Sequence, residues 1–508
     1  MFQTGPFLAG ALALGSLIYS SGTLADSSSD LPQADLNWLQ RVTWGADSAT
    51  VARYRKLGRA NFLDEQLHPH GDRDLPAPVK QQIAGLWVDQ QTPLTLENNW
   101  RYINDQLKTA TTDEQKQALQ KARNDLGNDL LQETMQRHLL RDLYSPDQLQ
   151  ERMNWFWLNH FSVYAGKNNL RNLIPDYEET AIRPHVLGHF RDLLLATMTN
   201  AAMLVYLDNA QNAVGKINEN YAREIMELHT MGVNSGYTQQ DVQELARVFT
   251  GLGVNFNPQP AKVKPELAAY LVRNGAFEFN PQRHDFGSKQ FLGQTIDGKG
   301  FAEIEQVADI LANQPATARF VSRKIATYFM AQTPPEHVVE QMAKTWQHTD
   351  GDIAAVLKTL LQSREFTASL GKQFKDPMAY TVSALRLAYD GRQIINLKPE
   401  VNWLNNLGEP LYGRLTPDGY PLTAEAWSSS GQMVKRFEIA RAIGSGNAGL
   451  FDQPDGSKGT GFPMLNNRLY YQLFDPYVSD TTRNALTQAA SQQEWNMLLL
   501  SSPEFMYD

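Results

Sequence analysis

Residues 145–161 have the sequence SPDQLQERMNWFWLNHF, which combines a strong helix start with a dense apolar run. Ser145 is a suitable N-terminal cap, and Pro146 suits the first helical position. Gln148 stands three residues after Ser145, where it completes a capping box. The stretch therefore predicts a helix with a defined beginning.

The apolar residues of this helix predict how it packs. They recur at steps of about four, three and four residues, which places them on one stripe: Leu149, Met153, Phe156 and His160. The neighbouring aromatic residues are interpreted as core: Trp155, Phe156, Trp157 and Phe161. The helix is expected to bury one face, and His160 lies on that face.

Helical periodicity extends from this stretch along most of the chain. Residues 96–143 predict two long amphipathic helices with a break around 109–112. Further helices are expected at 182–207, 219–231, 239–249, 302–313, 315–331, 335–347, 351–362, 376–389, 424–443 and 480–500. Gly, Pro and Asn predict loops at 66–80, 395–423 and 443–463.

Residues 252–297 have a different pattern, with short alternating runs separated by Gly, Asn and Pro. This pattern is typical of antiparallel strands. The predicted fold class is therefore mainly α: a multi-helix globular protein with a small antiparallel β insertion near 252–297. The expected organisation is a signal peptide at 1–25, an N-terminal helical segment at 26–94, a central helical region at 95–251, the β insertion, and a C-terminal helical region at 298–508 that is continuous with the central one.

Composition excludes several functional classes. The 508 residues carry a net charge of −9, which argues against a nucleic-acid binder because such proteins need a basic face. The chain has no cysteine, so it has no disulfides, thiolate metal sites or cysteine nucleophile.

The N-terminus has the pattern of a secretory signal peptide. Residues 1–25 carry no charged side chain, residues 7–19 form an apolar run, and Thr23 and Ala25 are small residues before Asp26. The run is too short to cross a bilayer, and no later segment has the roughly 18 consecutive apolar residues that a span requires. We therefore expect a periplasmic or secreted protein with no membrane span in its mature chain.

The best candidate site is the block 218–232, NENYAREIMELHTMG. On a helix, Asn220, Arg223, Glu224 and Glu227 share one sector, and His229 lies on the opposite, apolar side. Two carboxylates three residues apart can ligate a divalent metal or divide acid and base roles. The alternative is a solvated face with ion pairs from Glu219 to Arg223 and from Arg223 to Glu227, and a core role for His229.

Other histidines allow two interpretations each. His185 and His189 are four residues apart, a spacing at which two histidines on a helix can bind one transition metal. The alternative is that both are surface residues. His284 can form an acid/base pair with Asp285, with Lys289 nearby, or Asp285 simply forms a turn. His160 is a metal ligand or a core histidine.

The ordered motifs resemble the bacterial family called domain of unknown function 1800. The likeness covers nearly all of the mature chain. It rests on Arg41, Thr43 and Gly45 and on residues 151–153, 156–161, 182–185, 187–188, 190–191, 207–209, 220–232, 236–238, 241–242, 244, 246–247 and 249–251. Further matches are 284–285, 287, 289, 292–293, 315–319, 323–324, 363, 365–366, 407–408, 417, 419–421, 427 and 502–505. The resemblance implies a bacterial, often exported protein encoded beside a sulfatase-like protein, and it assigns no activity.

Two hypotheses follow. The first is an extracytoplasmic enzyme that performs metal-assisted or acid/base hydrolysis or transfer on an envelope or extracellular glycan or ester. Its candidate catalytic residues are Glu224, Glu227, His160, His229 and Arg223, and its candidate metal ligands are Glu224, Glu227 and His160. The second is a non-catalytic helical scaffold or accessory partner of a co-exported sulfatase-like protein or an envelope polymer. Residues expected to serve substrate binding or a polar network are Asp208, Asn209, Asn220, Asp241, His284, Asp285 and Lys289.

Overall fold

The computed structural model describes residues 31–233, 235–330 and 332–508, so the predicted signal peptide at 1–25 lies outside the described residues. The chain is 62% helical and 4% strand, and its strands form two small antiparallel sheets. The predicted fold class is confirmed.

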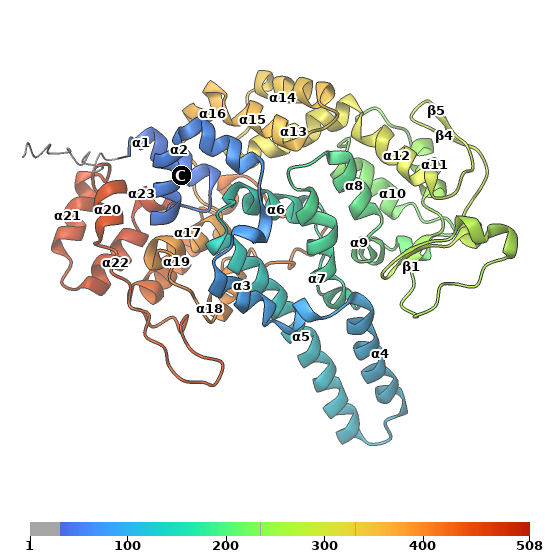
Figure 1. Cartoon of the computed structure of the whole chain (residues 1–508), viewed down its shortest axis with the longest axis horizontal. Helices are drawn as coiled ribbons and strands as arrows, with labels where there is room; N and C mark the ends of the chain where they lie inside the picture. The colour runs from blue at the N-terminus through green and yellow to red at the C-terminus, as the bar shows by residue number, and fades with distance from the viewer. Residues whose placement is uncertain (1–30, 234, 331) are drawn as a thin grey trace, which may run out of the picture.

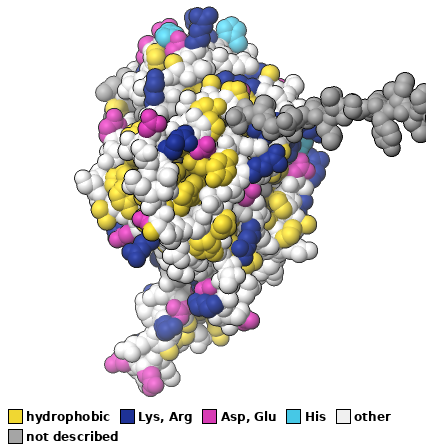
Figure 2. Space-filling model, turned by 90° about the vertical axis from the view of Figure 1, so that its left-hand side faces the viewer, with side chains coloured by type: hydrophobic (Ala, Val, Ile, Leu, Met, Phe, Trp, Pro, Cys, Tyr) yellow, Lys and Arg dark blue, Asp and Glu magenta, His cyan; other side chains and the backbone are white. Residues whose placement is uncertain are grey.

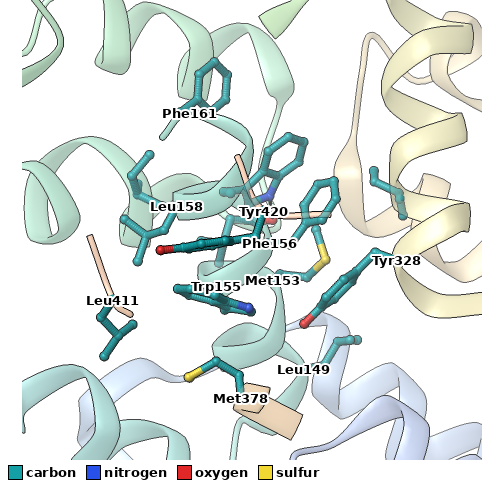
Figure 3. Packing of buried hydrophobic residues seen from close by; sticks show 14 of the residues in the cluster. Leu149, Met153, Trp155, Phe156, Leu158, Phe161, Tyr328, Met378, Leu411 and Tyr420 are labelled. Atoms are coloured by element: carbon teal, nitrogen blue, oxygen red, sulfur yellow. Dashed lines mark hydrogen bonds between the residues drawn. The ribbon is translucent and has the colours of Figure 1, made fainter. Parts of the chain in front are cut away.

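The helix predicted from residues 145–161 lies at the centre of the molecule. It is α6(Gln148–His160), and all of its residues are buried. Figure 3 shows its aromatic and aliphatic side chains packed against side chains from distant parts of the sequence, which include Tyr328, Met378, Leu411 and Tyr420. The aromatic residues expected in the core are buried.

The predicted buried face of α6 is confirmed, and its polar side chains are buried as well. Several of them have tertiary partners. Glu151 pairs with Arg183 at 2.5 Å, and the Arg152 guanidinium lies 4.6 Å from the centroid of the Trp44 ring. A central helix surrounded on all sides needs such partners for every charge.

The start of α6 also differs from the prediction. The Ser145 hydroxyl accepts a hydrogen bond from the backbone N–H of Asp147 at 3.1 Å, which makes a turn before the helix. The Gln148 amide donates to the backbone carbonyls of Asp142 and Ser145 at 3.0 and 2.8 Å. No capping box forms, because these two side chains instead fix the bend between α5 and α6.

The N-terminal part contains α1(Gln33–Val42), α2(Ser48–Leu67), η1(Gly71–Asp74), α3(Ala77–Ala84) and η2(Trp87–Gln90). The predicted loop at 66–80 is therefore only partly correct. The two long helices are confirmed as α4(Pro93–Thr109) and α5(Asp113–Tyr144), and they form a hairpin that projects from the body (Figure 1). Thr112 and Gln115 make the capping box that begins α5.

The central part is more broken than predicted. It contains η3(Leu170–Asn172), α7(Ile174–Asp176), the π-helix η4(Tyr177–Ile182), η5(Arg183–His185), α8(Phe190–Met198), α9(Ala201–Tyr206), η6(Asn209–Gln211), α10(Asn220–Glu224), the π-helix η7(Ile225–His229) and α11(Gln239–Val248). The helix expected at 182–207 is interrupted at Asn200, whose side chain caps α9 through the N–H of Ala202 at 2.9 Å. The side chains of Thr238 and Asp241 form the capping box of α11.

The β insertion is confirmed. Strand β3(Phe277–Phe279) lies between β1(Leu252–Val254) and β2(Val272–Asn274), and β4(Lys289–Phe291) pairs with β5(Gln294–Ile296). All pairs are antiparallel. A short helix, η8(Pro265–Tyr270), precedes β2, and η9(Pro281–Arg283) follows β3.

The C-terminal part returns across the molecule (Figure 1). It contains α12(Ala302–Ala312), α13(Pro315–Met330), α14(Glu336–His348), α15(Ile353–Leu361), α16(Arg364–Ser369), α17(Pro377–Tyr389), α18(Lys398–Asn406), η10(Ala424–Ala426), α19(Ser430–Gly444), α20(Arg468–Leu473), α21(Asp480–Gln488), α22(Gln492–Leu500) and α23(Pro503–Met506). The predicted loop at 395–423 contains α18, and the helix predicted at 480–500 divides into α21 and α22.

One cluster of buried hydrophobic side chains runs from Leu31 to Met506, and a small second cluster lies below α5. Figure 2 shows hydrophobic side chains gathered between charged ones on the face that the C-terminal helices form. Across the described residues, no helix is both long and apolar enough to cross a membrane.

Candidate functional site

The predicted polar block folds as a short α-helix that changes into a π-helix. Residues 220–224 form α10 and residues 225–229 form η7, so the block does not have the regular 100° periodicity expected of it. Single-turn π segments inside helices are often found at functional sites. The turn ends at Thr230, whose hydroxyl donates to the carbonyl of Ile225 at 2.7 Å. Gly232 follows with φ +86°, and a Cβ there would lie 2.7 Å from the Phe320 ring.

Arg223 is surrounded by partners on the outer side of this block. Its guanidinium lies 3.3 Å from Glu219 and 3.6 Å from Glu227, and it donates to the Gln239 amide oxygen at 2.8 Å. The side chain is 38% exposed. The predicted solvated pairs at i,i+4 therefore form, and at this exposure each contributes at most about 1 kcal/mol.

Glu224 differs from these neighbours. It is partly exposed, and within the described residues its carboxylate has no hydrogen bond or ion pair. Partial burial, followed by the charge of Glu227, raises the pKa of the Glu224 carboxyl, and Asp418 adds to the shift while Arg223 opposes it. A carboxylate that lacks a partner but is kept partly out of water is available for proton transfer.

Lys324 lies on α13. Burial lowers the pKa of its ammonium to about 8, and the charge of Asp418 opposes this shift only in part. Its Nζ lies 5.7 Å from the centroid of the Phe320 ring, and among residues 31–233, 235–330 and 332–508 no carboxylate pairs with it. Asp418 is exposed and is held by Arg414 at 2.9 Å. The charge of Asp418 therefore acts on the pKa of both Glu224 and Lys324.

His160 and His229 lie beneath this region. Both are buried, and the His160 Nε2 donates to the His229 carbonyl at 3.0 Å. Burial, with the charge of Lys324, lowers the pKa of His229 to about 3 and holds that of His160 well below its usual range. Both rings are therefore neutral, as expected for core histidines.

The predicted metal ligands Glu224, Glu227 and His160 are not brought together. In the part of the chain that the structure describes, no three His, Asp or Glu side chains are arranged to hold a metal ion. The reason is the depth of His160, whose imidazole is turned to a backbone carbonyl while the two glutamates lie near the surface. The same holds for His185 and His189, since the His189 Nδ1 lies 2.9 Å from the Asp350 carbonyl.

The loop that contains Asp208 is stabilised by side-chain contacts, most of which are hydrogen bonds to backbone carbonyls. Asp208 has φ +61° and pairs with Lys167 at 2.9 Å. The Asn209 amide donates to the carbonyls of Phe249 and Leu252 at 3.2 and 3.1 Å. The Asn220 amide donates to the Leu207 carbonyl at 3.1 Å. These predicted polar residues close the loop on α10 and β1.

Asp241 acts within its own helix and on the β insertion. It caps α11, and its Oδ1 accepts the N–H of Leu292 at 2.8 Å.

The pair predicted between His284 and Asp285 is wrong. The His284 Nε2 lies 2.9 Å from Oε1 of Glu303, and Lys289 pairs with Oε2 of the same carboxylate at 2.5 Å. All three side chains are fully buried, with Lys289 on β4 and Glu303 on α12. Asp285 instead pairs with Arg247 at 2.8 Å and accepts the N–H of Gly287, which confirms the turn-forming alternative.

A family model described as "Protein of unknown function (DUF1800)" matches residues 37–507. The chain belongs to the DUF1800 family. No curated protein and no solved structure matches it. The family description names no activity, so any function must be argued from the side chains themselves.

Sequence reasoning missed Lys324 and Asp418 as members of the candidate site. Lys324 belongs to the matched pair 323–324 that carries the DUF1800 resemblance, and Asp418 lies between the matched residues Pro417 and Gly419. This position in or next to the family motifs was the signal from which sequence reasoning could have included them. Neither residue is near block 218–232 in sequence. In the fold, the Phe320 ring of α13 lies close to Gly232, and the charge of Asp418 acts on Glu224.

Proposed function

We propose that this DUF1800 protein is an exported enzyme that hydrolyses or transfers an ester or glycosidic group, with Glu224 as general base and Lys324 as proton donor. The observation that carries the proposal is the Glu224 carboxylate itself. Its neighbours Glu219 and Glu227 share Arg223, whereas Glu224 has no partner among the described residues. A folded protein gains nothing in stability from such a carboxylate.

The proposed chemistry balances without further groups. Glu224 accepts a proton from water, whose oxygen forms the new bond to the acyl or anomeric carbon. The bond from that carbon to the leaving oxygen breaks, and Lys324 donates its proton to this oxygen. Asp418 supports the charged form of Lys324.

The proposal defines a pH profile. The reaction needs ionised Glu224 and protonated Lys324, so the rate falls as pH drops through the raised pKa of Glu224 and also as pH rises through about 8. A panel of chromogenic esters and glycosides is screened first with the purified protein. Any active substrate is then measured across pH with Glu224→Gln, Lys324→Arg and, as matched control, Glu219→Gln.

The expected result is a loss of about 10²-fold or more for Glu224→Gln, with Glu219→Gln unchanged. Lys324→Arg is expected to move the alkaline limb upward, because arginine stays protonated there. Full activity in Glu224→Gln would overturn the assignment.

A second candidate function is a non-catalytic scaffold that assists a co-exported sulfatase-like protein or an envelope polymer. One observation favours it: Arg223, Glu219 and Gln239 form a closed network, in which Gln239 also donates to Glu219 at 2.7 Å. Under this alternative the whole panel is inactive. Co-purification of the sulfatase-like protein with the parent, but not with Arg223→Ala, would favour it.

Export is part of the proposal and rests on the sequence of residues 1–25. Fractionation of cells expressing the full chain, followed by N-terminal sequencing, is expected to give a periplasmic or secreted protein that begins at Asp26. Cytoplasmic protein that keeps residues 1–25 would contradict it.

A further inference from the structure

A separate hollow lies where the α4–α5 hairpin meets the body. Its volume is about 710 Å³, which is within the range of small-molecule sites. Its wall contains side chains from α4, α5, the segment 165–172 and the loop after β1: Glu97, Trp100, Arg101, Arg123, Asn124, Asn168, Asn169, Arg171, Asn172 and Phe256. None of these residues was among the sequence-based candidates.

The positive charge in this hollow is only partly balanced. Arg101 pairs with Glu97 at 2.9 Å and lies over the Phe256 ring at 4.9 Å. The second oxygen of Glu97 accepts from the amides of Asn169 and Asn172 at 2.6 and 3.1 Å. This single carboxylate in the wall is therefore fully engaged.

Arg123 and Arg171 have only neutral partners. Arg123 donates to the Asn104 amide oxygen at 2.9 Å, and Arg171 donates to the Asn128 amide oxygen at 2.7 Å. Neither guanidinium pairs with a carboxylate within the described residues. In a chain with net charge −9, two uncompensated arginines in one hollow form a local site for an anion.

A glycine in α5 allows the Arg171 side chain to lie close to the helix backbone. Gly127 lies in the interior of the 32-residue helix α5, where glycine costs about 1 kcal/mol relative to alanine. A Cβ at this position would lie 3.2 Å from Cδ of Arg171. The glycine lets the arginine lie close against α5 with its head group at the hollow.

The remaining side chains of the wall provide the aromatic and amide groups that bind sugars. Trp100 is partly exposed and offers an aromatic surface, and the amides of Asn124 and Asn168 are exposed. Amide groups both donate to and accept from hydroxyls, while planar guanidinium groups match carboxylate or sulfate in a bidentate way. A free ion would leave most of this volume unfilled.

We propose that the hollow between α4, α5 and residues 165–172 binds an acidic saccharide, with Arg123 and Arg171 holding its carboxylate or sulfate groups. The proposal does not require the Glu224 reaction. The two regions adjoin, because Lys167 of the same segment pairs with Asp208, whose carbonyl accepts the Asn218 amide of block 218–232 at 3.1 Å.

Calorimetric titration of the full chain, as isolated, tests this. The probes are trigalacturonic acid, a sulfated disaccharide, a neutral galactose trisaccharide and an oligothymidylate. The variants are Arg123→Gln/Arg171→Gln and the matched double variant Arg191→Gln/Arg323→Gln, whose exposed arginines pair with Asp309 and Glu336. Melting curves establish that each variant is folded, and Trp100→Ala tests the sugar contact without a change in charge.

We expect at least one acidic saccharide to bind, with affinity at least tenfold weaker in Arg123→Gln/Arg171→Gln, severalfold weaker in Trp100→Ala, and unchanged in the matched double variant. Equal binding of the neutral trisaccharide, tighter binding of the oligothymidylate, or no binding of either acidic saccharide would overturn the proposal. None of these binding measurements depends on catalysis. A negative binding result would therefore not contradict the proposed role of Glu224, which the activity measurements test.

Discussion

Nδ1 of His138 lies 2.7 Å from Oε1 of Glu178, and both side chains are fully buried. The opposite ring nitrogen lies 3.1 Å from Asp142, so one imidazole on α5 joins two carboxylates. Glu178 also accepts from the Asn154 amide at 2.8 Å and from the Tyr412 hydroxyl. This network ties α5, α6, the π-helix η4 and the 407–423 loop together at the back of the candidate site.

The charge on His138 predicts a pH-dependent stability. Burial disfavours the charged ring, but Asp142 and Glu178 outweigh it and raise the pKa of His138 to about 10. Because the folded pKa exceeds the unfolded value, the stabilisation is complete below about pH 6.5 and is lost as pH rises through about 10. Urea unfolding is expected to place His138→Gln about 3–5 kcal/mol below the parent at pH 6, with a smaller gap at pH 9.5. A gap that stays constant across this range would be inconsistent with a charged His138.

The buried group of Glu303, Lys289 and His284 predicts strong coupling. Lys289→Met leaves the Glu303 carboxylate with only His284 and the backbone N–H of Gly300, and we expect a loss of about 3–5 kcal/mol. The double variant Lys289→Met/Glu303→Gln removes both charges and is expected to be more stable than Lys289→Met. Equilibrium unfolding of the two single variants and the double variant measures the coupling. Additive losses would show that the two side chains do not interact.

Substitution of Arg223 is predicted to change the free energy of unfolding only slightly. Its pairs with Glu219 and Glu227 are exposed, so Arg223→Ala is expected to cost less than about 1 kcal/mol. The loss should shrink further in 1 M salt, because exposed pairs are screened. Thermal melts at low and high salt check this, with Arg323→Ala at another exposed pair as the control. A loss of several kcal/mol would place Arg223 in a structural network instead.

Gly232 is predicted to resist substitution. Its φ of +86° is unfavourable for other residues, and a Cβ would contact the Phe320 ring at 2.7 Å. Gly232→Ala is expected to cost about 1–3 kcal/mol, whereas Gly236→Ala, also at positive φ but with open space around it, is expected to cost less. Comparison of the two melting temperatures separates crowding from backbone strain. Equal losses would mean that the Phe320 contact contributes nothing.

The sequence predicted features whose cause is local. The two long helices and the β insertion follow from residues a few positions apart. The paired outer face around Arg223 also follows from the i,i+4 spacing.

Features that depend on tertiary packing were not predictable. The partner of His284 is Glu303 on α12, although Asp285 is adjacent in sequence. The π-helix η7 changes the direction of the residues after Glu224, which no helical periodicity indicates. The charge of Asp418 acts on both Glu224 and Lys324, although the three residues are far apart in sequence.

The central claim is that the Glu224 carboxylate serves the proposed reaction and does not stabilise the folded protein. A thermal melt at pH 7 tests this claim without a known substrate. Because the folded state raises the pKa of Glu224, its ionised form is destabilising at this pH. Glu224→Gln is therefore predicted to melt at the same temperature as the parent or about 1 °C higher. Glu227→Gln, which loses its pair with Arg223, is predicted to melt at the same temperature or lower. A fall of several degrees in Glu224→Gln would contradict the claim and assign the residue to the structural network.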